Sequence, residues 1–352
     1  MNLMFGRPLF SFIGLLMLVS GCATVGSGHA SRLDLIRSRD ALLCGVSGKI
    51  PGFSFLRSDG RYQGMDVEIC RAVAAAVLAD PDKVQYRPLT APERFTALRT
   101  GEIDLLSRNT TFNLSRDATG GNGLTFAPVV FHDGQGLMVK KDSQIENLDA
   151  LSGQTICVGS GTTTEQNLND EFQKLGLSYT PVKYQDLNQV VAGFLQGRCA
   201  AMTSDRSQLA AARSGFPDPD QYLILEDVLS KEPLAPVTVG GDQRLGDVIR
   251  WVVYSLIAGE EFGITQDNIN EKLEMAKANP KLKSLRRFLG VDGGLGRKLG
   301  LEDDFIVKVI QATGNYGEIY ARNLGPKSRV PIPRGINQLF HQGGVMISPP
   351  FN

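Results

Sequence analysis

The stretch LLSRNTTFNLSRD, residues 105–117, overlaps the end of a short apolar run, EIDLL at 102–106, that is typical of a buried strand. It then places two arginines, two asparagines, two serines and two threonines around a single phenylalanine. Polar groups packed into a core without partners are costly. The segment therefore predicts a ligand site at a strand end, with its donors reserved for a ligand.

Composition indicates a soluble globular protein. The chain has 352 residues, of which 42% are hydrophobic and 21% charged, which is enough material for two medium domains. Lys+Arg and Asp+Glu balance at 37 each, so no global field favours nucleic acid or an anionic membrane surface. The phosphate-binding motif GxxxxGK[ST] does not occur, and the glycine-rich stretches GGNG and GGLG lack the spacing of a dinucleotide fingerprint. The sequence implies no cofactor.

Residues 1–30 are interpreted as an export signal followed by a flexible linker. Arg7 precedes the apolar run PLFSFIGLLMLVSGC, which is too short and too broken by serine and glycine for a comfortable membrane span. The run ends in LVSGC, which resembles a bacterial lipobox and predicts lipidation of Cys22. The alternative is an ordinary signal peptide cleaved later, for instance after Ala30. Under both interpretations the mature protein is predicted to be exported to the periplasm. Under the lipobox interpretation it is also anchored to the membrane.

Export makes the remaining cysteines interpretable as disulfides. Four cysteines are left once Cys22 is set aside, and four allow three connectivities. Proximity in the sequence favours Cys44–Cys70 and Cys157–Cys199, while the alternative is that these are small buried thiols. The three histidines, His29, His132 and His341, are scattered, so the pattern predicts no metal site.

Strand and helix patterns alternate along the chain, which predicts parallel sheets covered by helices. Expected strands are 42–48, 83–89, 102–106, 134–141, 155–160 and 199–205, and expected helices are 65–80, 93–101, 187–197 and 244–263. The pattern restarts near residue 134, which favours two α/β lobes with crossings near 131–137 and 230–238. We expect one lobe from 36–133 plus 235–275, a second from 134–234, and a C-terminal helical extension, 276–352, packed on the first.

Three polar residues at predicted strand ends have complementary charge. Arg116 follows the strand 102–106, Thr163 stands at the start of a helix whose free N–H groups favour an anion, and Asp205 ends the strand 199–205. A bidentate arginine for a carboxylate and an aspartate for an ammonium are what an α-amino acid requires. Each charge alone is more often a solvated surface group. Their joint placement favours a binding site between the lobes.

The chain resembles the general L-amino-acid binding proteins of ABC importers, which are solute-binding proteins of family 3. The resemblance covers nearly the whole mature chain and rests on these segments: CGVSGKIPGFS (44–54), GMDVEICRAVAAAV (64–77), ERFTALRTGEIDLLSRNTTFNLSRD (93–117), SGTTTEQNL (160–168), GRCAAMTSD (197–205), SKEPLAP (230–236), GNYGEIYARNLG (314–325) and RGINQLFHQGGVMISPP (334–350). It implies an α/β type II periplasmic-binding fold of two lobes that close on a ligand about a hinge, each lobe being a mixed, mainly parallel sheet flanked by helices. It also implies a monomer that binds L-amino acids with broad specificity. The monomer would deliver them to the membrane permease subunits of a transporter with a cytoplasmic ATPase.

The resemblance further implies roles for single residues. The carboxylate-binding arginine corresponds to Arg116, with Asn109 and Thr111 donating from the same loop. Thr163 corresponds to the helix start of the second lobe, and Asp205 to the ammonium-binding acid. Many relatives cover the ligand with an aromatic ring, and here Ile50 stands at that position, which implies a roomier, less selective pocket. Arg108 has no implied role. It is expected either to gate the cleft or, the favoured interpretation, to be an exposed charge.

An enzyme on the same fold is the alternative, since some periplasmic dehydratases and peptidoglycan-cleaving enzymes resemble it and fold does not fix function. Such an enzyme needs a placed acid or base with a shifted pKa. One arginine, one aspartate and neutral donors suit static binding instead. The sequence therefore predicts a binding protein, not an enzyme, with no catalytic residues.

Overall fold

The computed structural model describes residues 31–352, together with Met1 and Gly6. The predicted export segment, Cys22 and the alternative cleavage site after Ala30 lie outside the described residues. Within the described part of the chain, no helix is long and apolar enough to cross a bilayer.

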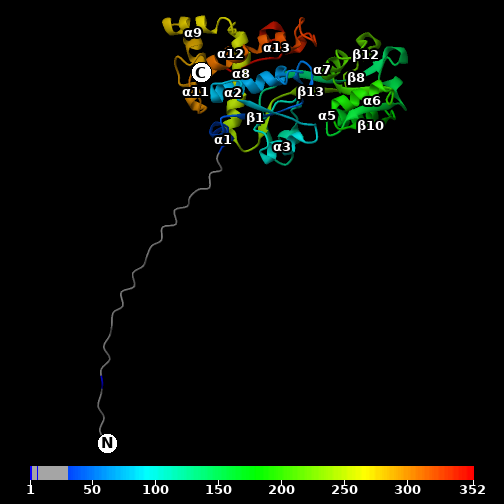
Figure 1. Cartoon of the computed structure of the whole chain (residues 1–352), viewed down its shortest axis with the longest axis horizontal. Coiled ribbons are helices and arrows are strands. Elements are labelled where there is room, and N and C mark those ends of the chain that lie inside the picture. Colours follow the sequence, from blue (N-terminus) through cyan, green and yellow to red (C-terminus); the bar gives the residue numbers. More distant parts are fainter. Residues whose placement is uncertain (2–5, 7–30) are drawn as a thin grey trace. The chain divides into compact units, whose positions relative to one another are not determined.

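The first sheet, whose strand β1 is labelled in Figure 1, has five strands in the order β5-β1-β6-β14-β7. β1 pairs in parallel with β5 and β6, whereas β14 runs antiparallel to β6 and β7. The bounds are β1 Leu42–Val46, β5 Val84–Pro88, β6 Leu105–Leu106, β7 Leu124–Phe126 and β14 Val237–Val239. The sheet is thus assembled from two stretches that are far apart in the sequence.

The second sheet has six strands: β10-β9-β11-β8-β12 in order, with β13 paired to β8. β10, β9 and β11 are parallel, and β8 is antiparallel to its neighbours β11, β12 and β13. The bounds are β8 Phe131–Lys140, β9 Thr155–Gly159, β10 Thr180–Tyr184, β11 Ala201–Asp205, β12 Tyr222–Ile224 and β13 Ser230–Leu234. Each sheet has three parallel strands on one side and antiparallel strands on the other, so both are mixed, which confirms the predicted α/β fold class.

The chain passes from the first sheet to the second between β7 and β8, and it returns between β13 and β14. These two connections lie side by side, because β13 pairs with β8 from Ser230↔Gln135 to Leu234↔Phe131. Any relative motion of the two sheets must bend this paired ribbon.

A small third sheet lies beside β1 in the chain and contributes Ile50 to the site described below. Its strands are β2 Lys49–Ile50, β3 Ser54–Leu56 and β4 Tyr62–Gln63. It leads into helix α2, Met65–Leu78, through Gly64, whose φ is 128°. A β-carbon at Gly64 would lie 2.1 Å from the Phe53 carbonyl oxygen, so only glycine fits this turn.

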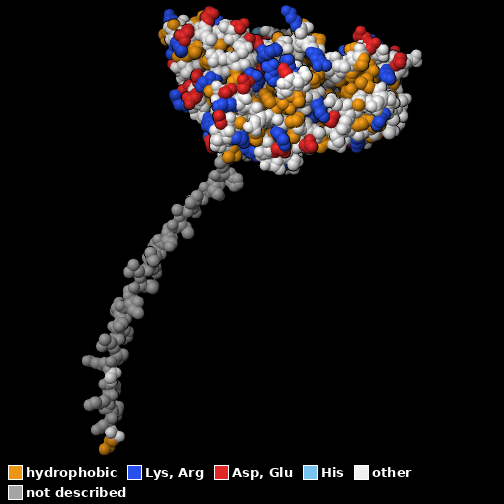
Figure 2. All heavy atoms as spheres, viewed as in Figure 1, with side chains coloured by type: hydrophobic (Ala, Val, Ile, Leu, Met, Phe, Trp, Pro, Cys, Tyr) orange, Lys and Arg blue, Asp and Glu red, His pale blue; other side chains and the backbone are white. Residues whose placement is uncertain are grey.

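The helices cover both sheets. Those before the C-terminal extension are α1 Arg32–Arg39, α3 Arg94–Thr100, α4 Leu114–Asp117, α5 Thr163–Lys174, α6 Leu187–Leu195, α7 Arg206–Arg213 and α8 Gln243–Glu261. Short 3-10 turns occur at η1 Lys141–Ser143, η2 Asp149–Leu151, η3 Pro219–Gln221, η4 Gly335–Asn337 and η5 Phe340–Gln342. On the face shown in Figure 2, acidic and basic side chains are interspersed, as the balanced net charge leads one to expect.

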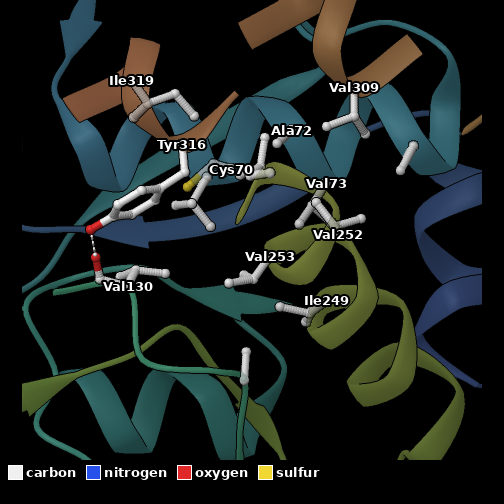
Figure 3. Close-up of a cluster of buried hydrophobic side chains, with 14 of the residues drawn as sticks. Cys70, Ala72, Val73, Val130, Ile249, Val252, Val253, Val309, Tyr316 and Ile319 are labelled. Atoms are coloured by element: carbon white, nitrogen blue, oxygen red, sulfur yellow. Dashed lines mark hydrogen bonds between the residues drawn. The ribbon is translucent and has the colours of Figure 1, made fainter. Parts of the chain in front are cut away.

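Helix α9, Ile269–Ala278, crosses the expected boundary at residue 276. The C-terminal extension beyond it contains α10 Lys283–Phe288, α11 Leu295–Lys298, α12 Phe305–Thr313 and α13 Tyr316–Leu324. Helix α12 packs on α2 and α8, and α13 packs on the same two helices. Figure 3 shows where they meet: apolar side chains of α2, α8, α12 and α13 converge in one buried cluster. The Tyr316 hydroxyl donates to the Val130 carbonyl 2.8 Å away, which ties the extension to the end of the first connection between the sheets, just before β8.

The four described cysteines form two disulfides, Cys44–Cys70 and Cys157–Cys199. The first joins β1 to α2, and the second joins β9 to the residues that precede β11. Each link therefore stays with one sheet and its helices. The pairing favoured by sequence proximity is confirmed.

Candidate functional site

A cavity of about 290 Å³ lies between the two sheets. Residues from both sides line it. From the side of the first sheet these are Ser47, Lys49, Ile50, Pro88, Leu89, Thr90, Ala91, Arg94, Arg108, Asn109 and Thr111; from the side of the second they are Gly159, Thr162, Thr163, Thr164, Gln185, Asp186, Leu187, Val190, Thr203, Ser204, Asp205 and Gln208. A concave site of this size with convergent polar groups is typical of a small-molecule pocket.

The topology explains why these residues meet. The parallel strands β1, β5 and β6 of one sheet and β9, β10 and β11 of the other all end at this cavity, since the residues at or just after their carboxyl ends line it. Ligands of open α/β sheets bind outside the carboxyl ends of the strands. Here two such edges face each other.

The segment 105–117 turns over the end of β6 and places Asn109 and Thr111 at the cavity. Asn109 has a left-handed backbone, with φ 42°, and its side chain is 6% exposed. Neither polar atom of that side chain has a hydrogen-bond partner in residues 31–352. Buried amides are normally satisfied, so this one is available to a ligand.

Arg116 is buried but is not among the residues that line the cavity. Its Nη1 donates to the Thr111 carbonyl at 2.8 Å, and its guanidinium carbon lies 5.3 Å from the centre of the Phe95 ring. Burial lowers the pKa of Arg116, and the nearby Glu232 and Asp205 partly offset that shift. Of the predicted site residues, the structure thus brings five to the cavity wall and places Arg116 behind it.

Arg94, the first residue of α3, lines the cavity and is a functional candidate that the sequence analysis missed. It is 3% exposed, and its Nε has no hydrogen-bond partner in the described part of the chain. No carboxylate among the described residues lies within ion-pair distance of its guanidinium. Burial, followed by the neighbouring Arg116 and Arg108 charges, lowers the pKa of Arg94 well below its ordinary value. An unpaired buried cation at a cavity suits an anionic ligand group.

Arg108 also lines the cavity, so its favoured interpretation as an exposed charge is wrong. The side chain is partly buried, and its Nε donates to the Leu89 carbonyl at 2.8 Å. Burial lowers its pKa to about 10, against the opposing effect of Asp66 and Asp205. The turn after β6 directs Arg108 inward over the end of β5, which residue spacing alone does not reveal.

Acidic groups gather on the opposite side. Asp205 ends β11, is 4% exposed and accepts a hydrogen bond from Gln208 Nε2 at 2.5 Å. Burial, together with the nearby Asp133 and Glu232, raises the pKa of the Asp205 carboxyl well above its ordinary value. A cation at this point would restore its charge.

Two hydroxyls at the seam between the sheets contact a further carboxylate. Thr111 and Thr163 both donate to Oε2 of Glu232, the latter at 2.9 Å, and their hydroxyl oxygens lie 3.3 Å apart. Thr163 begins α5, behind the cap residue Thr162, whose hydroxyl accepts the Glu165 N–H at 3.1 Å. Glu232 lies within SKEPLAP, residues 230–236, where no local pattern predicts this role.

Ile50 and one ion pair complete the wall. Ile50, in β2, is 2% exposed and lines the cavity as an apolar side chain. Lys49 Nζ lies 3.0 Å from Asp186 Oδ2, which belongs to the cap residue of α6 on the other sheet. Among residues 31–352, no group of three or more His, Cys, Asp or Glu is arranged to hold a metal ion.

Two α/β lobes that face each other across a polar cavity, joined by a paired two-strand connection, define a solute-binding protein of the type II periplasmic fold. The model of the bacterial extracellular solute-binding proteins, family 3, matches residues 42–288, and the chain belongs to this family. The match ends near α10, so most of the C-terminal extension lies beyond it.

Relatives match nearly the whole length of the chain. The chain is 44% identical to the glutamate/glutamine/aspartate/asparagine-binding protein BztA of Rhodobacter capsulatus, over 97% of this chain and 98% of BztA. It is 43% identical to the general L-amino acid-binding periplasmic protein AapJ of Rhizobium johnstonii, over 98% of each chain. A periplasmic binding protein of an ABC transporter from Brucella ovis, solved with glutathione bound, superposes with a TM-score of 0.87 at 40% identity, covering 92% of this chain and all of that one.

Proposed function

We propose that this protein is the extracytoplasmic substrate-binding component of an ABC importer, and that it captures L-amino acids in the cavity between its lobes. The observation that carries the proposal is the cavity itself, which has the unpaired guanidinium of Arg94 on one sheet and the buried carboxylate of Asp205 on the other. An α-amino acid offers one partner to each. The amino-acid ligands in the names of BztA and AapJ support the same class.

The proposed ligand contacts are Arg94, Arg108, Asn109, Thr111, Thr163, Asp205 and Ile50. Asn109 and the two arginines hold the ligand carboxylate, and Asp205 holds the ammonium group. Arg116 acts from behind the wall, where it fixes the Thr111 carbonyl and supplies positive charge; direct contact with the carboxylate requires its side chain to turn toward the cavity. Ile50 contacts the ligand side chain.

Charge at the cavity favours particular side chains among the amino acids. Lys49 and Asp186 neutralise each other, so Arg94 and Arg108 face Asp205 as the remaining charged groups of the wall. A ligand with a second carboxylate, or with a side-chain amide that can accept from an arginine, uses this excess of donors. The proposed range is therefore broad, with the highest affinity for acidic and amide amino acids.

The proposal includes the cellular setting. As an extracytoplasmic family member, the protein delivers its ligand to permease subunits coupled to a cytoplasmic ATPase, and it acts as a monomer. The LVSGC sequence supports lipidation of Cys22 and anchoring to the membrane. Replacing Cys22 by serine and fractionating cells tests the anchor, since the lipobox interpretation expects the protein in the soluble periplasmic fraction.

The dehydratase-like enzyme is the weaker proposal. Asp205 has the raised pKa that an acid catalyst needs, but the cause is burial next to two other acids, and a bound ammonium would remove it. The relatives reported above are named as binding proteins. Recovery of each ligand unchanged after prolonged incubation with the protein is the expected result.

Calorimetry of the ligand-free protein against all common L-amino acids and glutathione tests the main proposal. We expect saturable binding of several amino acids with one site per chain. Silence toward every amino acid, from a folded protein, contradicts it.

A further inference from the structure

Glu232 is a buried carboxylate near the cavity that accepts four side-chain hydrogen bonds, although it does not itself line the wall. It lies in β13, on the return connection between the sheets, and is 1% exposed. Its Oε2 accepts from Thr111 and Thr163, and its Oε1 accepts from Asn167 at 2.8 Å and from Ser230 at 2.6 Å. Four donors satisfy this carboxylate without any ligand, so its contacts belong to the protein.

The donors of Oε2 come from both lobes. Thr111 follows β6 of the first sheet, and Thr163 is the first residue of α5, which follows β9 of the second. Both hydroxyls line the cavity. The Oε2 atom of Glu232 therefore accepts hydrogen bonds from one threonine of each lobe, Thr111 and Thr163.

A threonine hydroxyl has one proton to donate and two lone pairs that accept. A carboxylate only accepts, so both hydroxyl protons must point at Glu232 and away from the cavity. What Thr111 and Thr163 offer to a ligand is then oxygen lone pairs. We infer that Glu232 is a positioning residue that makes this part of the wall an acceptor surface, selecting for a ligand with an α-ammonium group.

This inference rests on the proposed amino-acid binding and gives the ligand an orientation. The ammonium group meets Asp205 and the two threonine oxygens, and the carboxylate meets Arg94, Arg108 and Asn109. It differs from the role that the family resemblance implied for Thr111, which was expected to donate to the carboxylate. The difference follows from Glu232, which takes that proton first.

Glu232→Gln inverts the polarity with little change of shape. Oε1 of the glutamine stays with Asn167 and Ser230, both of which donate, so its Nε2 faces the two threonines and donates to them. Their protons are then free to point into the cavity.

The measurement is the ratio of two affinities, one for the tightest-binding L-amino acid and one for the same acid with hydrogen in place of its amino group. We expect this ratio to fall by about tenfold or more, since a hydrogen bond to a charged group is lost. Glu226→Gln, the same change at an exposed position, leaves the ratio as in the wild type.

Loss of the Glu232 charge also strengthens binding of any anion, so a second variant without a charge change separates the two effects. Thr163→Val has nearly the same shape and removes one acceptor. If Glu232 has this role, Thr163→Val also lowers the ratio of affinities, because the deaminated acid makes no contact with the Thr163 hydroxyl oxygen. If Thr163→Val weakens the deaminated acid as much as the amino acid, the hydroxyl acts as a donor and the inference is wrong. It is also wrong if Glu232→Gln leaves the ratio unchanged. A wild-type protein that binds no amino acid overturns the proposed function first, and this inference with it.

Discussion

Lys49 of β2 and Asp186 at the start of α6 form an ion pair, 3.0 Å from Nζ to Oδ2, although they belong to opposite sides of the cavity. Burial alone would raise the pKa of Asp186, but the hydrogen bond from Lys49 and the helix N–H groups hold it below its usual value. The pair joins the lobes at the cavity, far in the sequence from the connections that also join them. It therefore reports on whether the lobes are closed.

Lys49→Ala should weaken ligand binding by a few fold. The side chain of Lys49 is 42% exposed, and exposed pairs contribute about 0.2–1 kcal/mol, so a larger loss is not expected. Titration calorimetry at low and high salt checks this, because salt should shrink the difference between wild type and variant. Lys83→Ala, which breaks the exposed Lys83–Asp40 pair on another face, serves as the control and should bind normally. Equal losses in both variants would contradict a closure role.

Arg94→Met should stabilise the ligand-free protein and nearly abolish binding. A buried guanidinium without a carboxylate partner is costly, and methionine fills the space without that cost. Binding should fall by about ten- to a hundredfold or more, because the lost contact joins two charged groups. Thermal unfolding with and without ligand measures both effects. Arg99→Met, on the exposed side of the same helix, should change neither. Tight binding by Arg94→Met would transfer the carboxylate role back to Arg116.

Strand and helix patterns predicted the elements well, because each depends on its own residues. The helix expected over 65–80 is α2, Met65–Leu78, and the strand expected over 134–141 is β8, Phe131–Lys140. The strand expected over 102–106 is shorter: β6 pairs with β1 only at Leu105 and Leu106, and the residues before it lie in the turn after α3.

Strand ends pointed to Arg116, Thr163 and Asp205, of which Thr163 and Asp205 line the cavity. Asn109 and Thr111, whose roles only the family resemblance implied, line it too. Arg94 was missed because, within ERFTALRTG, it reads as an ordinary first-turn residue of an amphipathic helix. Its burial depends on tertiary packing, which includes the neighbouring Phe95 ring and the segment that carries Arg108 and Arg116. The same strand-end rule, applied to the turn after β5, could have found it. Glu232 needed the register of β13 against β8, which no local pattern contains.

Ligand affinity should rise with pH until Asp205 is ionised in the free protein. Its pKa is raised in the ligand-free state, and an ammonium partner lowers it in the complex, so binding releases a proton between the two pKa values. Release of a proton makes binding stronger as pH rises through that window. Calorimetry in buffers of different ionisation enthalpy measures the proton directly. Asp205→Asn should bind weakly and without this pH dependence, whereas Asp170→Asn, exposed on α5, should retain it. Uptake of a proton on ligand binding, instead of release, would contradict this prediction.

Reduction of the disulfides should lower stability without preventing ligand binding. The links span 26 and 42 residues in the sequence, and loops of that size correspond to about 3–4 kcal/mol of stabilisation each. Each bond stays within its own lobe, the first bond in one lobe and the second in the other, so neither restrains lobe closure. Unfolding in denaturant, with and without reductant, measures the first effect, and calorimetry of the reduced protein measures the second. Peptide mapping of the exported protein should find no link between the lobes.

Ile50→Phe should narrow the range of ligands. The contacts proposed for the carboxylate and ammonium groups are common to all α-amino acids, so discrimination depends on the side-chain region that Ile50 borders. Ile50 is 2% exposed, so the larger phenylalanine side chain can only extend into the cavity or strain the wall. Amino acids with large side chains should lose affinity, by about 1–3 kcal/mol, and small ones should keep most of theirs. Calorimetry of wild type and variant against the same panel measures this difference, and Ile50→Val provides the matched change in the opposite direction. Uniform loss across the panel, with the fold intact, would show that Ile50 does not border the side chain.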